Sequence, residues 1–177
     1  MAPGRAPLVL FTTLARDERL FGKFFSGGLL DRGHLKLRER ELVIDRTTAL
    51  NGCEYEWGVH VAFFGERVGL TPRQTESLVH GGPQDDCWSE GDALLLRLCD
   101  ELHQTSTLSD DLWAALRAHH CEEAMLELLM LAGFYRTVSC LCNAIRLPLE
   151  PDGARFPRAQ PACGVITTEA ADRVAGP

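Results

Sequence analysis

The sequence predicts an all-α protein, a helical bundle that forms a single domain. Apolar residues recur at the three- and four-residue spacing of helices along most of the chain. Alternating runs of β-branched and aromatic residues, which are typical of strands, are nearly absent. The 177 residues fit one domain that can bury a real core. We expect this domain to cover residues 1–148.

The first half of the chain contains three segments with helical periodicity. Residues 7–25 form the first of them, and Gly27 and Gly28 end it. Residues 36–50 mix acidic and basic side chains with apolar ones, so we expect a helix whose outer face is solvated. Asn51-Gly52 ends that helix, and a further helix is predicted over 53–68.

The second half shows clearer helix starts. Thr71-Pro72 with Gln74 forms a capping box, and Ser89 and Ser109 are predicted to cap the helices over 93–103 and 111–119. The longest apolar stretch, 122–145, carries charged residues, so a buried core helix is favoured over a membrane span. After Pro148 the composition becomes rich in Pro, Gly and Ala, which predicts an extended or disordered tail over 149–177.

Charge and cysteine usage exclude some function classes. The net charge of -7 and the pI near 5.3 argue against a general attraction to nucleic acid or to an anionic membrane. The N-terminus lacks the apolar core and the cleavage site of a signal peptide. The cysteines number seven and are scattered, as expected of reduced thiols. We therefore expect a cytoplasmic protein.

The chemically informative segment runs from Glu41 to Gly65. Cys53, Glu56 and His60 occupy positions i, i+3 and i+7, so they share one face of a helix within two turns. A thiol, a carboxylate and an imidazole on one face can transfer protons. Cys53 also falls at a helix N-terminus, where the helix dipole and free N–H groups favour a thiolate.

Each of these residues also has an ordinary structural interpretation. A cysteine at a helix start is often just a small, tolerated residue, and a surface glutamate is usually solvated. Tyr55 and Trp57 suit packing or an interface, or the lining of a substrate pocket. Arg136 could bind an anionic substrate or pair with a buried carboxylate.

The string CEYEWGVH from Cys53 to His60, preceded by Glu41, resembles the alkylhydroperoxidase-D-like and carboxymuconolactone-decarboxylase-like family. The resemblance extends over roughly 7–150, through LLRLCDELHQTSTLSDDLWAAL and LLMLAGFYRTVSCLCNA. It implies an AhpD-like helical bundle. In the alkylhydroperoxidase-D branch a Glu precedes a Cys-x-x-Cys pair, and a His follows the second Cys by four residues. Glu41, Cys53 and His60 match this pattern.

Glu56 replaces the second cysteine of the pair. The other cysteines are distant in sequence, and Cys140 and Cys142 do not face each other on a helix. We therefore expect no nearby resolving thiol, so an oxidised Cys53 would stop at sulfenic acid and need an external thiol.

Three functions follow as hypotheses. The first is cofactor-independent acid/base chemistry, such as decarboxylation or isomerisation, on a small organic acid or ring. In it Glu56 and His60 form the base/acid pair, Glu41 orients His60, and Cys53 donates a proton or acts as a redox nucleophile. The second is thiol-dependent reduction of hydroperoxides through Cys53. The third is a non-catalytic helical module.

The resemblance also bears on cofactors and partners. The donor set could ligate zinc, but the resemblance implies a metal-free site, so we expect neither metal nor cofactor. A homo-oligomer is expected, commonly a trimer or hexamer, acting on a small-molecule substrate.

Overall fold

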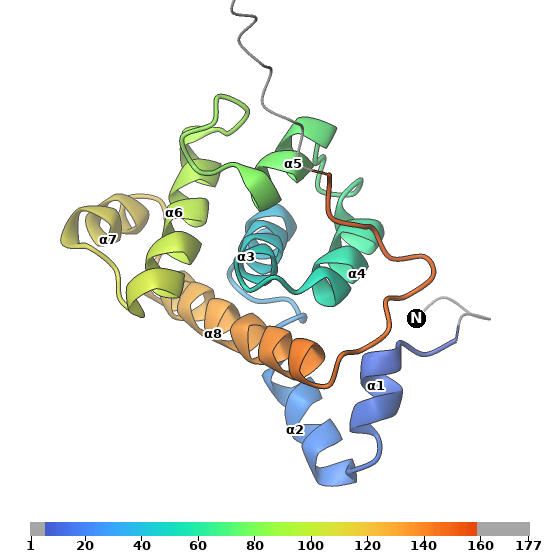
Figure 1. Ribbon diagram of the computed structural model, residues 1–177. Helices are drawn as coiled ribbons and strands as arrows, with labels where there is room; N and C mark the ends of the chain where they lie inside the picture. The colour runs from blue at the N-terminus through green and yellow to red at the C-terminus, as the bar shows by residue number, and fades with distance from the viewer. Residues whose placement is uncertain (1–5, 159–177) are drawn as a thin grey trace, which may run out of the picture.

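The described chain is entirely helical, as predicted. A computed structural model describes residues 6–158, and no strand occurs among them (Figure 1). Its helices are α1 (Val9–Leu14), α2 (Glu18–Gly27), α3 (Leu37–Leu50), α4 (Glu54–Phe64), α5 (Pro72–His80), α6 (Glu90–Thr105), α7 (Asp110–Arg117) and α8 (Glu122–Ala144).

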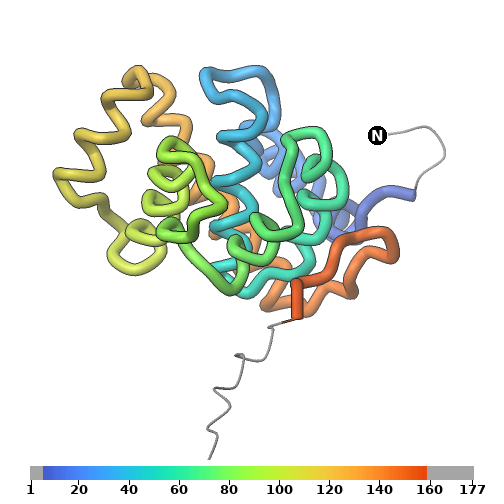
Figure 2. Tube along the Cα trace, turned by 90° about the horizontal axis from the view of Figure 1, so that it is seen from above, coloured from blue at the N-terminus to red at the C-terminus, as the bar shows by residue number. Residues whose placement is uncertain are grey.

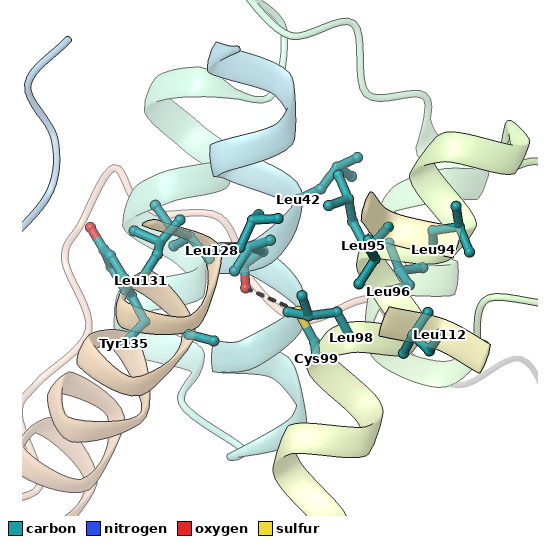
Figure 3. Packing of buried hydrophobic residues seen from close by; sticks show 14 of the residues in the cluster. Leu42, Leu94, Leu95, Leu96, Leu98, Cys99, Leu112, Leu128, Leu131 and Tyr135 are labelled. Atoms are coloured by element: carbon teal, nitrogen blue, oxygen red, sulfur yellow. Dashed lines mark hydrogen bonds between the residues drawn. The ribbon is translucent and has the colours of Figure 1, made fainter. Parts of the chain in front are cut away.

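Helix α3 is the centre of the bundle. It packs against α4, α5, α6 and α8, which surround it in Figure 1. Leucines from five helices, α3 and α5 to α8, meet in the main core, among them Leu42, Leu96 and Leu128, all fully buried (Figure 3). Burying a leucine side chain contributes roughly 1.5–3 kcal/mol, so this layer holds the helices together.

Half of the charged residues of α3 lie inside the protein, so the expectation that its charged side chains form a solvated outer face is wrong for these residues. Residues 41–48 are all buried, and they include Glu41, Asp45 and Arg46. Arg46 forms an ion pair with Asp100 on α6, with 2.7 Å between Nε and Oδ1, and donates to the carbonyl of Leu78. A protein tolerates buried charged groups when they are paired in this way. The periodicity of the sequence does not reveal such partners, because they lie on other helices.

The predicted first segment, 7–25, is two helices instead of one. Asp17 breaks it, because its side chain accepts a hydrogen bond from the Leu20 amide and so caps a new helix. Helices α1 and α2 therefore form a hairpin-like pair that projects at one end of the bundle in Figure 1.

Two of the three predicted caps form the expected side-chain hydrogen bonds, whereas Ser109 stands at the N-cap of α7 but its hydroxyl donates to Glu101 instead. Thr71 and Gln74 form the capping box of α5, and the Ser89 hydroxyl accepts a hydrogen bond from the Asp92 amide at the start of α6. Helix α4 is shorter than the predicted 53–68 and ends at Phe64. A turn that closes at Gly69, with φ of 70°, follows it.

Residues 147–158 leave α8 and run without helix along α4 toward α5, as both views show (Figures 1 and 2). The Ala154 amide donates to the Gly58 carbonyl at 2.9 Å. A Cβ at position 58 would lie 2.3 Å from the Ala154 carbonyl oxygen, so glycine is required for this close approach. The boundary between a domain over 1–148 and a tail over 149–177 stays a prediction, and 159–177 lie outside the described residues.

Helix α8 is long and apolar enough to cross a membrane by length and composition. This is weak evidence, because core helices pass the same test. Its buried residues, such as Leu128 and Leu131, pack into the main core against α3. We therefore describe α8 as a core helix of the bundle.

Candidate active site

The α3–α4 turn positions the predicted residues. Asn51 follows the last residue of α3, and Gly52 adopts a positive φ of 61°, which glycine tolerates. Cys53 is the residue before α4, and Glu56 and His60 follow at one-turn spacing on that helix. Their common face turns toward α3 and α8, where Glu41 and Tyr135 meet them.

His60 lies at the centre of a buried hydrogen-bond network. Its Nδ1 is 2.7 Å from Glu41 Oε2, and its Nε2 is 3.1 Å from the Tyr135 hydroxyl and 3.4 Å from Glu56 Oε1. Arg40 donates to the other oxygen of Glu41 through Nε and Nη2. Both oxygens of Glu41 are therefore occupied, and this carboxylate fixes the orientation of the imidazole.

The carboxylates keep His60 charged. Burial lowers the pKa of the imidazole, but hydrogen bonds with Glu41 and Glu56 outweigh burial and raise that pKa to about 10. At neutral pH His60 is consequently an imidazolium, with a proton on both nitrogens. Burial raises the pKa of the neighbouring Asp45 carboxyl group well above its usual range.

An apolar pocket opens onto this network. Its volume is about 580 Å³, and Glu56, His60 and Tyr135 are among the residues that line it. Its walls are largely aromatic and come from α1, α2, α4 and α8: Phe11, Phe24, Phe25, Phe63, Phe64 and Phe134. Such a concave apolar site with a few convergent polar groups is typical of a small-molecule site.

Glu56 is the unsatisfied member of the network. Its side chain is buried, one oxygen faces His60, and its Oε2 has no hydrogen-bond partner among residues 6–158. An unpaired buried carboxylate oxygen is costly, and such groups are concentrated at sites that bind a ligand.

Cys53 lies behind the pocket wall. It is fully buried in a second apolar cluster with Leu10, Val59, Val138 and Cys142. A hydrogen bond from the Cys142 thiol is the main cause that lowers the pKa of Cys53, and the Glu56 amide and Ser139 side chain add to it. The expectation that no other thiol lies near Cys53 is wrong, because α8 brings Cys142 beside it.

The three predicted substrate-binding residues do not line this pocket. The Tyr55 hydroxyl accepts a hydrogen bond from the Leu10 amide and donates one to the Glu150 carboxylate, so it links α1 and the C-terminal segment to α4. Trp57 is fully buried and contacts Phe156. Arg136 is exposed on α8 and lines a separate pocket of about 240 Å³ with Thr47 and His103.

Sequence reasoning missed Tyr135, Arg40 and Cys142. Tyr135 and Cys142 lie on α8, more than seventy residues after α4, so no local spacing connects them to the motif. Arg40 lies next to Glu41, but it was assigned to a solvated helix face. Between residues 6 and 158, no group of three or more His, Cys, Asp or Glu side chains is arranged to hold a metal ion.

Comparison with known proteins bears on the family. Residues 19–81 match the model of the carboxymuconolactone decarboxylase family, and this segment contains Glu41, Cys53, Glu56 and His60. The match supports the resemblance predicted from the sequence over the segment that carries the motif. The match to the carboxymuconolactone decarboxylase model ends before α6, so Tyr135 and Cys142 lie outside it.

Solved structures confirm the AhpD-like fold. A peroxidase-related protein from Silicibacter sp. TM1040 has a TM-score of 0.73 at 16% identity, covering 84% of this chain and 80% of that one. An alkylhydroperoxidase AhpD core protein from Ralstonia eutropha JMP134 has a TM-score of 0.71 at 22% identity, covering 81% of this chain and 77% of that one. A protein of unknown function from Agrobacterium tumefaciens has a TM-score of 0.61 at 20% identity, covering 80% of this chain and 91% of that one. No curated protein sequence matches the chain.

Proposed function

We propose that the protein is a cofactor-independent enzyme that performs acid/base chemistry on a small ring compound or organic acid. One observation carries the proposal: Glu56, with an unpartnered carboxylate oxygen, lines an aromatic pocket directly beside the charged His60. Two titratable groups with opposite charge and different environments can divide the roles of base and acid.

Glu56 is the base in this proposal. Its free Oε2 accepts a proton from a substrate carbon next to a carbonyl group, and the resulting enolate oxygen needs hydrogen-bond donors. His60 supplies a charged donor at Nε2, and the Tyr135 hydroxyl, whose pKa burial raises well above its usual range, supplies a neutral one. The same groups suit isomerisation, in which the proton returns to a different carbon of the substrate. They also suit decarboxylation, in which loss of CO₂ leaves an enolate that they protonate.

Glu41 is a positioning residue here, because it contacts His60 and Arg40 but does not line the pocket. Cys53 does not line the pocket either, so we assign it no proton transfer in this reaction.

The pocket indicates the substrate class. Its aromatic walls suit a flat, apolar body, and its lining includes few ionisable side chains, namely Asp31, Glu56, His60 and Tyr135. A small ring with one enolisable carbonyl group, such as an unsaturated lactone or an aromatic keto acid, meets both conditions.

Turnover of carboxymuconolactone, measured by CO₂ release, tests the proposal. We expect Glu56→Gln and His60→Gln each to lower the rate by roughly 10²- to 10⁴-fold, the usual contribution of a positioned acid or base. Glu66→Gln, at an exposed position just after α4, is the matched control and should not change the rate. Unchanged turnover in both site variants would rule out the pairing of Glu56 with His60.

Reduction of hydroperoxides through Cys53 is the second candidate. The observation in its favour is the environment of the thiol, in which Cys142, the Glu56 amide and Ser139 all lower the pKa of Cys53. Thiolates attack peroxides, so a lowered pKa suits this chemistry. Absence of both activities would fit the third hypothesis, a non-catalytic helical module. For all three we propose a cytoplasmic location.

A further inference from the structure

Two thiols from distant parts of the chain lie together behind the pocket. Cys53 precedes α4, and Cys142 lies in the last turn of α8. Both are buried in one apolar cluster, and each thiol shifts the pKa of the other.

Several contacts hold the two thiols in place. The Asn143 side chain, next to Cys142, donates to the Asn51 carbonyl at 2.9 Å and so joins the end of α8 to the turn before Cys53. The Leu147 amide donates to the Cys142 carbonyl, and the Cys53 amide donates to the Thr48 carbonyl. These bonds leave the backbones of both cysteines fixed relative to each other.

The environments of the two thiols differ. The hydrogen bond between them lowers the pKa of Cys53 and raises that of Cys142 far above its usual range. Cys53 is therefore the more acidic of the two thiols. In such a pair the thiolate reacts first with an oxidant.

The pocket and the thiol cluster share a wall. Val59 belongs both to the thiol cluster and to the pocket wall, and Leu8, Phe11, Phe24 and Phe134 pack against the cluster and line the pocket. The thiols therefore lie one layer of side chains behind an apolar cavity. An organic hydroperoxide with an apolar body fits this arrangement.

We propose that Cys53 and Cys142 form an intramolecular dithiol–disulfide pair, in which Cys142 takes the place of the cysteine that Glu56 replaces. This inference rests on the second candidate function. The Cys53 thiolate attacks the outer oxygen of a hydroperoxide ROOH, which gives a Cys53 sulfenic acid and releases RO⁻, protonated to ROH. The Cys142 sulfur then attacks the Cys53 sulfur, forming the S–S bond and releasing water. The two thiols lose two electrons to the peroxide, and an external dithiol returns them.

Disulfide mapping tests the inference on the full chain. The reduced protein is treated with one equivalent of cumene hydroperoxide, and its peptides are analysed by mass spectrometry without reduction. We expect a cross-linked peptide that joins Cys53 to Cys142, with the loss of two thiols per chain. Cys142→Ser should instead accumulate a Cys53 sulfenic acid that dimedone traps. Cys140→Ser, at the exposed position two residues earlier, is the matched control and should still form the cross-link.

Other outcomes separate the inference from the candidate function. A Cys53–Cys142 disulfide without catalytic turnover of peroxide under excess dithiothreitol would uphold the pair while removing the peroxidase function. Cys53-dependent turnover that Cys142→Ser leaves unchanged, with no cross-link in the wild type, would overturn the pair while retaining the function. Both thiols remaining reduced in excess cumene hydroperoxide would also overturn the inference.

Discussion

His60 shows how single residues set the chemistry of this site. Its ring lies between Glu41 on one side and Glu56 with Tyr135 on the other. The sequence predicted that Cys53, Glu56 and His60 share a helix face, and the family resemblance added Glu41. Tyr135 could not be predicted, because its contact with His60 spans 75 positions and depends on how α8 packs.

The charge on His60 makes stability depend on pH. Its pKa is about 10 in the folded protein and near 6.5 in an unfolded chain. Because the pKa of His60 is higher in the folded protein, the charged imidazole stabilises the fold. This contribution to the free energy of unfolding is complete below pH 6.5 and is lost as the pH rises through about 10. We expect the free energy of unfolding to fall across this range, measured by urea unfolding at a series of pH values.

His60→Gln is the control for this pH dependence. Glutamine keeps a donor for Glu41 but does not titrate, so the decline between pH 6.5 and about 10 should become much shallower. An equal decline of the unfolding free energy in the wild type and in His60→Gln would mean that other groups cause the pH dependence and that His60 is not held as an imidazolium.

Helix α3 is where sequence reasoning failed at the level of elements. Its charged residues predicted a solvated face, yet Glu41, Asp45 and Arg46 are buried. Local patterns could not show this, because two of the ionic partners lie on other helices: Asp100 on α6 and His60 on α4. Helix caps, by contrast, depend on residues three positions apart, and Thr71 and Ser89 were predicted correctly.

Two arginines on α3 allow a matched test of burial. Arg46 pairs with Asp100 and is 7% exposed, and Arg38 pairs with Asp92 and is 29% exposed. Both also donate to carbonyl groups. Arg46 is the more buried arginine, and it also donates to the carbonyl groups of Ser77, Leu78 and Gly81. Its removal breaks a largely buried ion pair, so Arg46→Ala should cost about 3–5 kcal/mol of unfolding free energy.

Arg38→Ala, at the more exposed ion pair, should cost about 1 kcal/mol or less. Chemical denaturation of both variants gives the comparison. Equal losses would show that burial of the ion pair does not determine its contribution, and that α3 is less central to stability than its position suggests.

At the scale of the whole molecule, α8 links the pocket, the thiol pair and an exposed apolar surface. Its buried face supplies Tyr135 and Cys142, while Leu126 and Met130 on the outer face are 62% and 61% exposed. These two residues lie one turn apart, on the same side of the helix. The expected homo-oligomer, a trimer or hexamer, is a proposal for which this surface is a suitable contact.

Light scattering coupled to size-exclusion chromatography tests that proposal. We expect the wild type to be larger than a monomer and the double variant Leu126→Glu, Met130→Glu to have a lower mass. Ala118→Glu, at an exposed position on the end of α7, controls for added charge. A monomeric wild type, or a double variant of unchanged mass, would show that this surface does not hold an oligomer together.

The central claim is that the aromatic pocket performs acid/base chemistry through Glu56 and His60. The most direct measurement is deuterium incorporation into phenylpyruvate in D₂O, followed by proton NMR, because exchange at the carbon next to the carbonyl reports proton abstraction itself. We predict exchange faster than the buffer rate in the wild type and in Glu66→Gln, and a loss of roughly 10²- to 10⁴-fold in Glu56→Gln. Exchange at the buffer rate in the wild type, or equal exchange in Glu56→Gln, would contradict the account.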